Sequence, residues 1–250
     1  MVTDHLRVED ADGIRVLTID RPEARNALHG PLRRELRSAF LAAEGDNSVR
    51  VVVLTGTDPA FSAGVDFKEI DRGPDSAAGP LDNPAIAVRA MGKPVVCAVN
   101  GACVSGALEI ALSSSFIVAS QRARFADTHS QLGVLPTWGL TALLPRAVGV
   151  RKAREMSLTG VFVDANEALR LGLVNHVVPH EELLPFTLAL ARRVPEGPVV
   201  GEMLELYRRG GDLGLSGALA AEVAISAGRT YDLEAFSAAG RRVSASQRNT

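Results

Sequence analysis

The feature that most constrains the fold is a run of β-branched residues, RVVVLTGT at residues 50–57, which ends in turn residues. A run without polar alternation is typical of a strand buried on both faces of a parallel sheet. The pattern returns at residues 94–99, followed by a glycine-containing turn, an apolar helix at about residues 106–112 and a strand at residues 116–119. Because strand, turn, helix and strand follow in succession, the sequence predicts parallel βαβ units and an α/β fold.

The amino-terminal part shows the patterns of a hairpin and a helix. Residues 6–19 alternate apolar and polar side chains around Asp12-Gly13, a dipeptide suited to the positive φ angles of a tight turn. After Pro31, a good first helical residue, apolar side chains recur every three or four positions and predict one buried helix face. They are Leu32, Leu36, Phe40 and Ala43.

The rest of the chain combines one loop with a series of helices. Residues 71–83 are rich in Gly, Pro, Asp and Ser, and we expect a mobile loop there, over one face. Helical patterns dominate from about Trp138: residues 140–148, 151–158, 165–171, 181–193 and a tail from Gly201. We expect a core over residues 1–195 and a C-terminal helical region over residues 196–250, with a frayed end at 241–250.

Composition excludes several classes of protein. The 250 residues are 46% apolar and 22% charged, typical of one soluble globular domain. Lysines plus arginines (27) nearly balance aspartates plus glutamates (29), so the net charge of -2 favours neither nucleic acid nor an anionic membrane. Cys97 and Cys103 are too few for a disulfide framework, and the sequence shows neither a secretory signal nor a membrane span. We expect a cytoplasmic location.

Two stretches place small residues where a buried strand gives way to a helix, at residues 59–70 and 99–112. Ala63 and Gly64 permit close backbone approach in the first stretch, and Gly106 does so in the second. Amide N–H groups at such helix starts are unpaired and attract anions or developing oxyanions. Two of them, from separate turns, would form an oxyanion hole, although small residues at strand ends also serve packing alone.

Glu109 is the one charge in the expected apolar helix, in its first turn. Burying an unpaired carboxylate costs several kcal/mol, so Glu109 must be solvated, paired or functional. A favourable interaction with the helix dipole is the simplest alternative to a catalytic role.

Several ordered motifs carry a resemblance to one family. They are IDRPEARNAL, FSAGVDFKE, KPVVCAVNGACVSGALEIAL, RFADTHSQLGVLPTWGLTALLPRAVG and LTGVFVDANEALRLGLVNHVV. From about Val8 to Val178 the chain resembles the enoyl-CoA hydratase/isomerase, or crotonase, family. The resemblance implies a crotonase-like spiral of ββα units with a C-terminal helical region that mediates homotrimers, often paired into hexamers. It also implies an acyl-CoA thioester ligand in fatty acid metabolism, with coenzyme A part of the substrate and no separate cofactor.

The resemblance also assigns roles to residues around the two turns. The amides of Val65 and Gly106 match the family's two donors to the thioester carbonyl. Residues 65–68, which include Phe67, would lie along the bound coenzyme A, and carbonyls near Ala63 and Asp66 would face its adenine amino group. The side chains that could approach its phosphates are Arg21, Arg25 and Lys68, although such residues are often solvated surface charges.

For catalysis, Glu109 matches the first of two glutamates with which family hydratases position and activate water. The second would lie four residues after Phe125, where this chain has His129. His129 could transfer the missing proton, orient the acyl group, or be an ordinary polar residue. Asp127 is a candidate to orient the His129 ring, but neighbours in a strand point to opposite faces. Thr128 is no better placed for this role by sequence alone.

Two further departures from the family pattern bear on the substrate. Ser105 replaces a glycine and would add a hydroxyl beside the oxyanion hole. Trp138 stands where smaller residues usually begin a helix, and it could shorten the acyl tunnel, stack on the acyl group or simply pack in the core.

The sequence therefore predicts a hydratase or isomerase, with hydration of a 2-enoyl-CoA as the leading activity. A diverged homologue that binds acyl-CoA without turnover remains an alternative, as does a serine hydrolase of the Clp type using Ser105 and His129. His176, His180 and Glu181 suggest a metal site only weakly, because Pro179 breaks the helical register, and we expect no metal.

Overall fold

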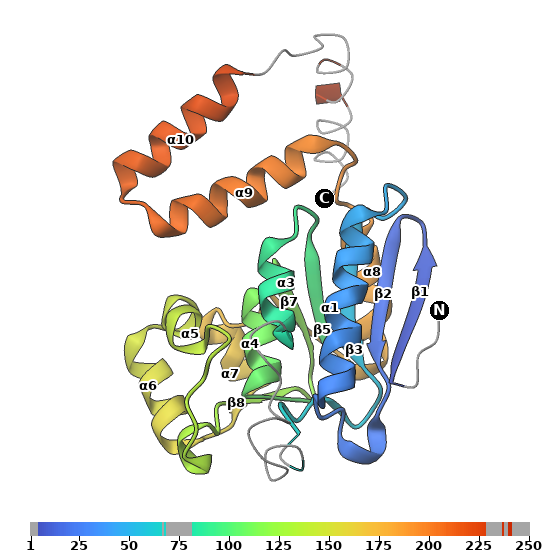
Figure 1. Cartoon of the computed structure of the whole chain (residues 1–250), viewed down its shortest axis with the longest axis vertical. Coiled ribbons are helices and arrows are strands. Elements are labelled where there is room, and N and C mark those ends of the chain that lie inside the picture. Colours follow the sequence, from blue (N-terminus) through green and yellow to red (C-terminus); the bar gives the residue numbers. More distant parts are fainter. Residues whose placement is uncertain (1–4, 67, 69–81, 229–236, 238–239, 242–250) are drawn as a thin grey trace. The chain divides into compact units, whose positions relative to one another are not determined.

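Parallel strands form the centre of the fold, as the buried apolar runs predict (Figure 1). The computed structural model describes residues 5–66, 68, 82–228, 237 and 240–241. A six-stranded sheet has the order β1-β2-β3-β5-β7-β10, in which β1 is antiparallel to β2 and the other pairs are parallel. Its strands are β1 (Leu6–Ala11), β2 (Ile14–Ile19), β3 (Val51–Gly56), β5 (Val95–Val99), β7 (Phe116–Ser120) and β10 (His176–Val178).

A smaller sheet follows the ends of these strands. Its order is β4-β6-β8-β9, with β9 antiparallel to β8. Its strands are β4 (Ala60–Ser62), β6 (Ala102–Val104), β8 (Arg124–Ala126) and β9 (Val163–Asp164). Three strands of the large sheet, β3, β5 and β7, are each followed directly by one strand of the small sheet, which is the repeated ββ arrangement expected of a spiral of ββα units.

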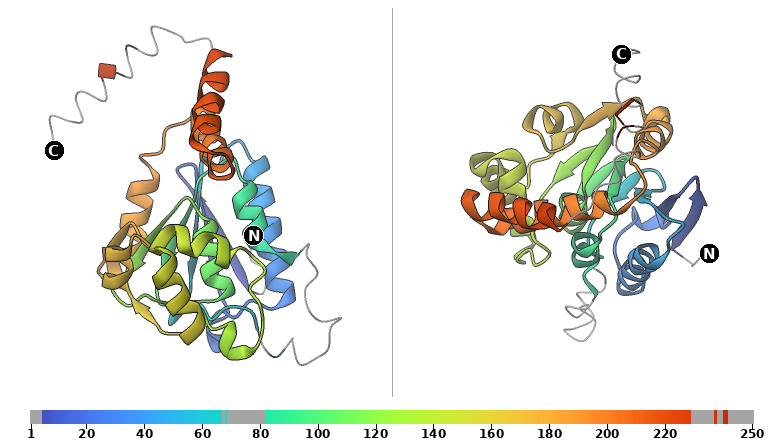
Figure 2. Two further views of the ribbon diagram at one scale, coloured as in Figure 1. Left: turned by 90° about the vertical axis from the view of Figure 1, so that its left-hand side faces the viewer. Right: turned by 90° about the horizontal axis from the view of Figure 1, so that it is seen from above.

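Alternate residues of the buried strands pack on opposite faces of the large sheet. Val52 and Leu54 of β3 join a core with helices α1 (Gly30–Gly45), α3 (Pro84–Ala90) and α4 (Gly106–Ser113). Val51 and Val53 face the other way, against α8 (Leu183–Ala191). Figure 2 shows α8 on one side of the sheet and α1 with α3 on the other. This double burial explains why β3 has no polar alternation.

The local predictions for the amino-terminal part are confirmed. Asp12 and Gly13 have φ angles of 55° and 76°, which a tight hairpin turn requires. The four predicted apolar residues of α1 are all buried, and Pro31 lies in its first turn.

Helix α3 was not predicted from the sequence. Asn83 is its N-cap, and the side-chain oxygen of Asn83 accepts hydrogen bonds from the amides of Ala85 and Ile86. The loop expected at residues 71–83 thus ends in a cap, and its residues 71–81 lie outside the described residues.

The remaining helices follow the predicted order with shifted ends. The expected helix at 181–193 is a 3-10 turn, η4 (His180–Glu182), followed by α8, and the tail helix begins before Gly201. The others are η1 (Pro22–Ala24), η3 (Ser130–Leu132), α5 (Leu140–Val148), α6 (Val150–Thr159), α7 (Ala165–Leu171), α9 (Pro198–Asp212) and α10 (Leu215–Ala227). None of these helices has the length and apolar character needed to cross a bilayer.

The chain divides into two units, Met1–Gly201 and Glu202–Thr250. The first holds both sheets. The trimerisation role of residues 196–250 stays a prediction, and residues 242–250 of the expected frayed end lie outside the described part of the chain.

Candidate active site

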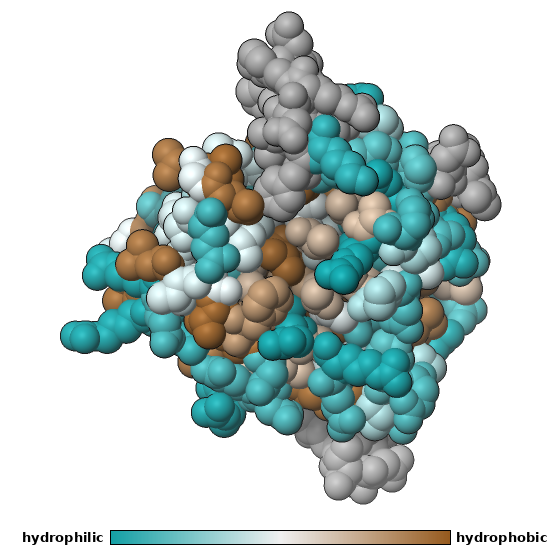
Figure 3. Space-filling model, turned by 90° about the horizontal axis from the view of Figure 1, so that it is seen from below, coloured by the Kyte–Doolittle hydropathy of each residue, from teal (hydrophilic) through white to brown (hydrophobic). Residues whose placement is uncertain are grey.

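The two predicted turns adjoin each other at the carboxyl ends of the strands. Figure 3 shows the molecule from this end, where apolar side chains gather near the middle of the face and hydrophilic side chains border them. Gly64 has a φ angle of 88°, and a Cβ placed on it would lie 2.7 Å from the carbonyl oxygen of Val104 and 3.5 Å from the amide nitrogen of Gly106. Only glycine allows this close approach of one turn to the other.

The amide of Val65 is left free by the bonds around it. The amide of Leu28 donates to the carbonyl of Gly64 (2.8 Å), and the amide of Asp66 donates to the carbonyl of Leu28 (3.3 Å). Gly106 is the first residue of α4. Among the described residues, no acceptor bonds the N–H of Val65 or of Gly106, so both donors are available to a ligand.

Gly106 also lies against Trp138. A Cβ on Gly106 would lie 3.1 Å from the Trp138 ring and 3.2 Å from Cγ2 of Val65. The half-buried Trp138 thus packs against the core beside the second turn, and a side chain at position 106 would be tight enough that this ring or Val65 would have to shift slightly.

Glu109 is buried on α4, with 2% of its surface exposed. Its Oε1 accepts hydrogen bonds from the amides of Trp138 (2.7 Å) and Leu140 (3.1 Å), at the start of α5. Burial raises the pKa of Glu109 above its ordinary value, although these two amides and the nearby His129 oppose the change. A carboxyl group with a raised pKa can exchange a proton nearer neutral pH, which suits acid or base catalysis.

His129 faces Glu109 and is bound to Asp127. The distance from His129 Nε2 to Glu109 Oε2 is 3.8 Å, and the distance from His129 Nδ1 to Asp127 Oδ1 is 2.5 Å. The expectation that strand alternation separates Asp127 from His129 is wrong, because residues two apart lie on the same face of a strand, and β8 in any case ends at Ala126, before this pair. The amide of His129 also donates to Asp127 Oδ1 (3.1 Å).

Ser105 does not pair with His129 as a serine hydrolase would require. Its Oγ lies 2.9 Å from the Thr128 hydroxyl and accepts a hydrogen bond from the Thr128 amide, also at 2.9 Å. Its φ angle of 49° is strained for a residue other than glycine. The hydroxyl therefore fixes the turn after β8 to the start of α4.

The residues predicted to contact coenzyme A differ in their exposure and in the bonds that they make. Asp66 is buried, and its carboxylate accepts hydrogen bonds from the Arg21 guanidinium (2.6 Å) and the Lys68 amide (3.1 Å). Arg25 is exposed, and its carbonyl accepts a hydrogen bond from the Ala63 amide (3.0 Å). Lys68 is exposed as well, whereas Phe67 lies outside the described residues. Arg21 is thus committed to Asp66, while Arg25 has no ion pair in the described part of the chain.

Two supporting residues were missed in the sequence. The buried side chain of Asn26 donates to the carbonyls of Thr57 and Ala60, which fixes the loop before β4. Arg89 of α3 donates to the Trp138 carbonyl (2.7 Å) and to Ser113 Oγ (2.8 Å), and its charge acts on Glu109. A lone arginine in the otherwise apolar α3 was the available signal.

His180 belongs to a second cluster, at the ends of β3 and β7. His180 Nε2 lies 2.9 Å from Asp58 Oδ2, and Nδ1 lies 2.9 Å from Ser120 Oγ. Burial acts to raise the pKa of Asp58, but hydrogen bonds from Asn100 and His180 lower it below its ordinary value. No group of three or more His, Cys, Asp and Glu side chains in the described ranges could hold a metal ion.

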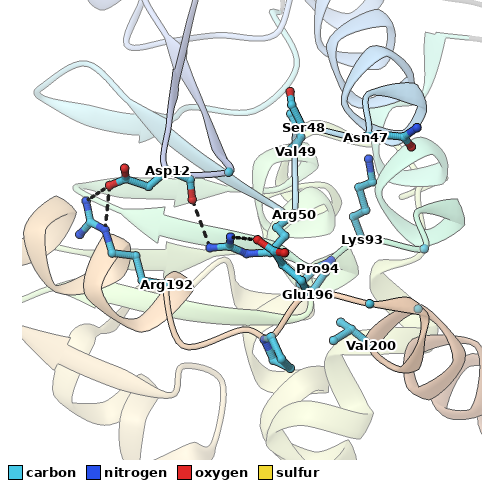
Figure 4. A pocket seen from close by; sticks show the side chains of 15 residues that line it. Asp12, Asn47, Ser48, Val49, Arg50, Lys93, Pro94, Arg192, Glu196 and Val200 are labelled. Atoms are coloured by element: carbon cyan, nitrogen blue, oxygen red, sulfur yellow. Dashed lines mark hydrogen bonds and ion pairs between the residues drawn. The ribbon is translucent and has the colours of Figure 1, made fainter. Parts of the chain in front are cut away.

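A cavity of about 770 Å³ lies at the opposite ends of the strands, before β3 and β5 (Figure 4). Its charged groups bind one another: Arg50 pairs with Glu196 and Arg192 pairs with Asp12. Lys93 donates to the carbonyls at the end of α1. Because these charges are paired within the protein, this cavity is a weaker candidate than the site around Glu109.

Comparisons with known proteins bear on the family and the fold of the chain. The family model for enoyl-CoA hydratase/isomerase matches residues 9–207. Crotonyl-CoA hydratase of Syntrophomonas wolfei is 36% identical over 199 residues, covering 78% of this chain and 76% of that protein. The crystal structure of enoyl-CoA hydratase from Mycobacterium tuberculosis H37Rv is 41% identical, with a TM-score of 0.77 over 88% of this chain and 97% of that one. The enzyme from Mycobacterium avium is 43% identical, with a TM-score of 0.76 over 90% and 99%. The predicted crotonase fold class is confirmed.

Proposed function

Because the chain belongs to the enoyl-CoA hydratase/isomerase family, we propose that it adds water across the double bond of a 2-enoyl-CoA thioester. One observation supports this activity above the others. The buried carboxylate of Glu109 lies in the first turn of the helix whose first amide, that of Gly106, adjoins the free amide of Val65. A proton acceptor and a pair of oxyanion donors are thereby combined in one place.

The two amides polarise the thioester. The N–H groups of Val65 and Gly106 donate to the thioester oxygen, and they bind it more strongly as it gains charge. Each such donor contributes roughly 3 kcal/mol to transition-state stabilisation. The carbon β to the thioester then becomes electrophilic.

Glu109 activates the water. With Oε1 held by two backbone amides, Oε2 is the oxygen that takes a proton from water. The water oxygen bonds to carbon β while the electrons of the double bond move toward the thioester oxygen, giving an enolate. Delivery of a proton to carbon α, from Glu109 or from His129, restores the carbonyl and completes the addition of one water molecule.

The remaining predicted roles belong to the same proposal. Ala63, Gly64, Asp66, Phe67 and Lys68 bind the coenzyme A moiety, with Arg25 near its phosphates. Trp138 borders the acyl group. Coenzyme A is part of the substrate and no separate cofactor is required. We also propose that the protein assembles into homotrimers, either single or paired into hexamers in the way that the family resemblance implies, and that it is located in the cytoplasm.

The test is turnover by the Glu109→Gln variant. The glutamine oxygen can still accept from the amides of Trp138 and Leu140, so the fold and ligand binding are retained, while the base is lost. We expect the rate of loss of the conjugated enoyl thioester to fall by about two to four orders of magnitude. Isothermal titration with a saturated acyl-CoA measures binding separately, and full activity in this variant would contradict the mechanism.

The wild-type protein decides between the alternatives. Mass spectrometry against short, long, branched and aromatic enoyl-CoA esters should reveal a hydrated product. Tight acyl-CoA binding without any product would support the binding-protein alternative. Labelling of Ser105 by a fluorophosphonate would support the serine hydrolase, which the contact of Ser105 with Thr128 disfavours.

A further inference from the structure

The turn at residues 127–129 is fixed by hydrogen bonds within the turn and by hydrogen bonds to helix α6. Asp127 is 1% exposed, and its carboxylate accepts hydrogen bonds from the amide and the ring of His129. The Ser157 side chain of α6 supplies a further hydrogen bond. Ser130 also donates to the carbonyl of Ser157 (2.5 Å), so α6 fixes this turn at two points.

The partners of Asp127 keep it ionised. Burial acts to raise the pKa of Asp127, but the hydrogen bonds from His129 and Ser157 outweigh burial and lower it. An ionised carboxylate accepts hydrogen bonds and donates none. The His129 ring must therefore carry a proton on Nδ1, and in the neutral ring Nε2 is the acceptor.

That acceptor faces Oε2 of Glu109, the carboxylate oxygen to which no backbone amide in the described part of the chain donates. The 3.8 Å between Nε2 and Oε2 is too long for a direct hydrogen bond, and it suits two groups that share one water. Within the described ranges, the charged groups around the ring are Asp127 from its own turn and Glu109 from α4. Helix α6 presents the neutral Ser157, and Arg89 of α3 acts on Glu109.

We propose that Asp127 is a positioning residue, which holds His129 as the Nδ1–H tautomer so that Nε2 and Glu109 Oε2 together bind and deprotonate the attacking water. This inference rests on the proposed hydration. The water loses only one proton on attack; when Nε2 takes it in place of Glu109 Oε2, the Asp127 carboxylate stabilises the resulting imidazolium, and that same proton returns to carbon α of the enolate. No proton is transferred to Asp127.

The experiment compares Asp127→Asn with a matched substitution elsewhere. Asp127→Asn keeps the shape of the side chain but removes the charge that fixes the tautomer. We expect kcat to fall by about a hundredfold, with KM for the enoyl-CoA changed less than threefold. Asp127→Glu should restore part of the rate. Asp58→Asn, which changes the carboxylate bound to His180, should leave kcat unchanged and controls for general loss of an Asp–His contact.

A double variant separates positioning from a general structural role. If Asp127 acts through His129, Asp127→Asn combined with His129→Ala should be no slower than His129→Ala alone. A further loss in the double variant, or wild-type kcat in Asp127→Asn, would overturn the proposal.

The tautomer can be measured without turnover, so failure of the hydratase assignment leaves this test intact. In ¹⁵N NMR, the His129 ring signals, assigned by their absence in His129→Gln, should show Nδ1 protonated in the wild type and not in Asp127→Asn. A wild-type ring with its proton on Nε2 at neutral pH would refute the proposal even where Asp127→Asn fails to fold.

Discussion

Two histidines in this protein are each bound to an aspartate, and they differ in what their second ring nitrogen meets. His129 Nε2 faces a buried carboxylate at 3.8 Å, a distance that leaves it free to bind another molecule. The nitrogens of His180 are both occupied, by Asp58 and by the hydroxyl of Ser120. An Asp–His pair is therefore not by itself a sign of catalysis.

The two Asp–His pairs also differ in how far their side chains are exposed to solvent. Asp127 and Glu109 are each 2% exposed in their side chains, whereas the Asp58 side chain is 56% exposed. Ser120 is completely buried, so the Asp58–His180–Ser120 row cannot present a nucleophile to a substrate. We interpret the second row as a structural clasp that joins the loop after β3, the end of β7 and the turn before α8.

Substitution of His129 should have the largest effect. His129→Ala should lower kcat by about a hundredfold or more, because the water loses one of its two acceptors. His129→Glu should lose less, since a carboxylate can accept the same hydrogen bond. Steady-state kinetics with one enoyl-CoA measures both. Equal rates for the alanine variant and the wild type would place His129 with the structural histidine.

His180→Ala should instead reduce stability. The change removes the hydrogen bonds of the His180 ring with the buried Ser120 hydroxyl and with the Asp58 carboxylate, at a cost of about 1–3 kcal/mol. Urea denaturation should show this loss as a lower midpoint, while kcat stays within twofold of the wild type. A fall in kcat comparable to that of His129→Ala would remove the distinction between the two clusters.

The sequence predicted elements whose signal is local and repeated. Strand β3 and helix α1 could be read from the spacing of apolar residues. Strands β4, β6 and β8 have three residues each, too few for a periodic signal, and they were expected only through the family resemblance. Helix α3 was hidden because its cap, Asn83, ends a stretch with the composition of a loop.

The site was predictable where one residue contradicts its surroundings. Glu109 is a lone charge in an apolar helix, so it could be identified without a structure. Alternation could not decide the pairing of Asp127 with His129, because residues two apart share a face only while the backbone is extended, and β8 ends one residue before Asp127. His180, Ser120 and Asp58 are far apart in sequence, and no local pattern brings them together.

Ser120→Ala tests the weaker half of the clasp. The Ser120 Oγ also accepts a hydrogen bond from the Arg122 amide (3.0 Å), so its removal affects two polar groups. The two groups are the Arg122 amide and Nδ1 of His180. Each can find a new hydrogen-bond partner more easily than the surrounding residues can fill the space left when the His180 ring is removed. We expect a loss of about 1 kcal/mol in the free energy of unfolding, smaller than for His180→Ala, with unchanged kcat. A larger loss than for His180→Ala would show that the hydroxyl, and not the ring, fixes the end of β7.

The smallest effect should appear in the pH dependence of stability at Asp58. Its pKa is lowered in the folded protein, so the carboxylate stabilises the fold above its unfolded pKa, and this contribution is lost as pH falls through the folded pKa. Asp58→Asn should therefore be less stable than the wild type at pH 6, and the difference should narrow below about pH 3.9, the ordinary aspartate value. Thermal denaturation of both proteins across this range measures the difference. A gap that stays constant with pH would mean that the Asp58 contacts do not depend on its charge, and the clasp would then rest on the Ser120 hydrogen bond alone.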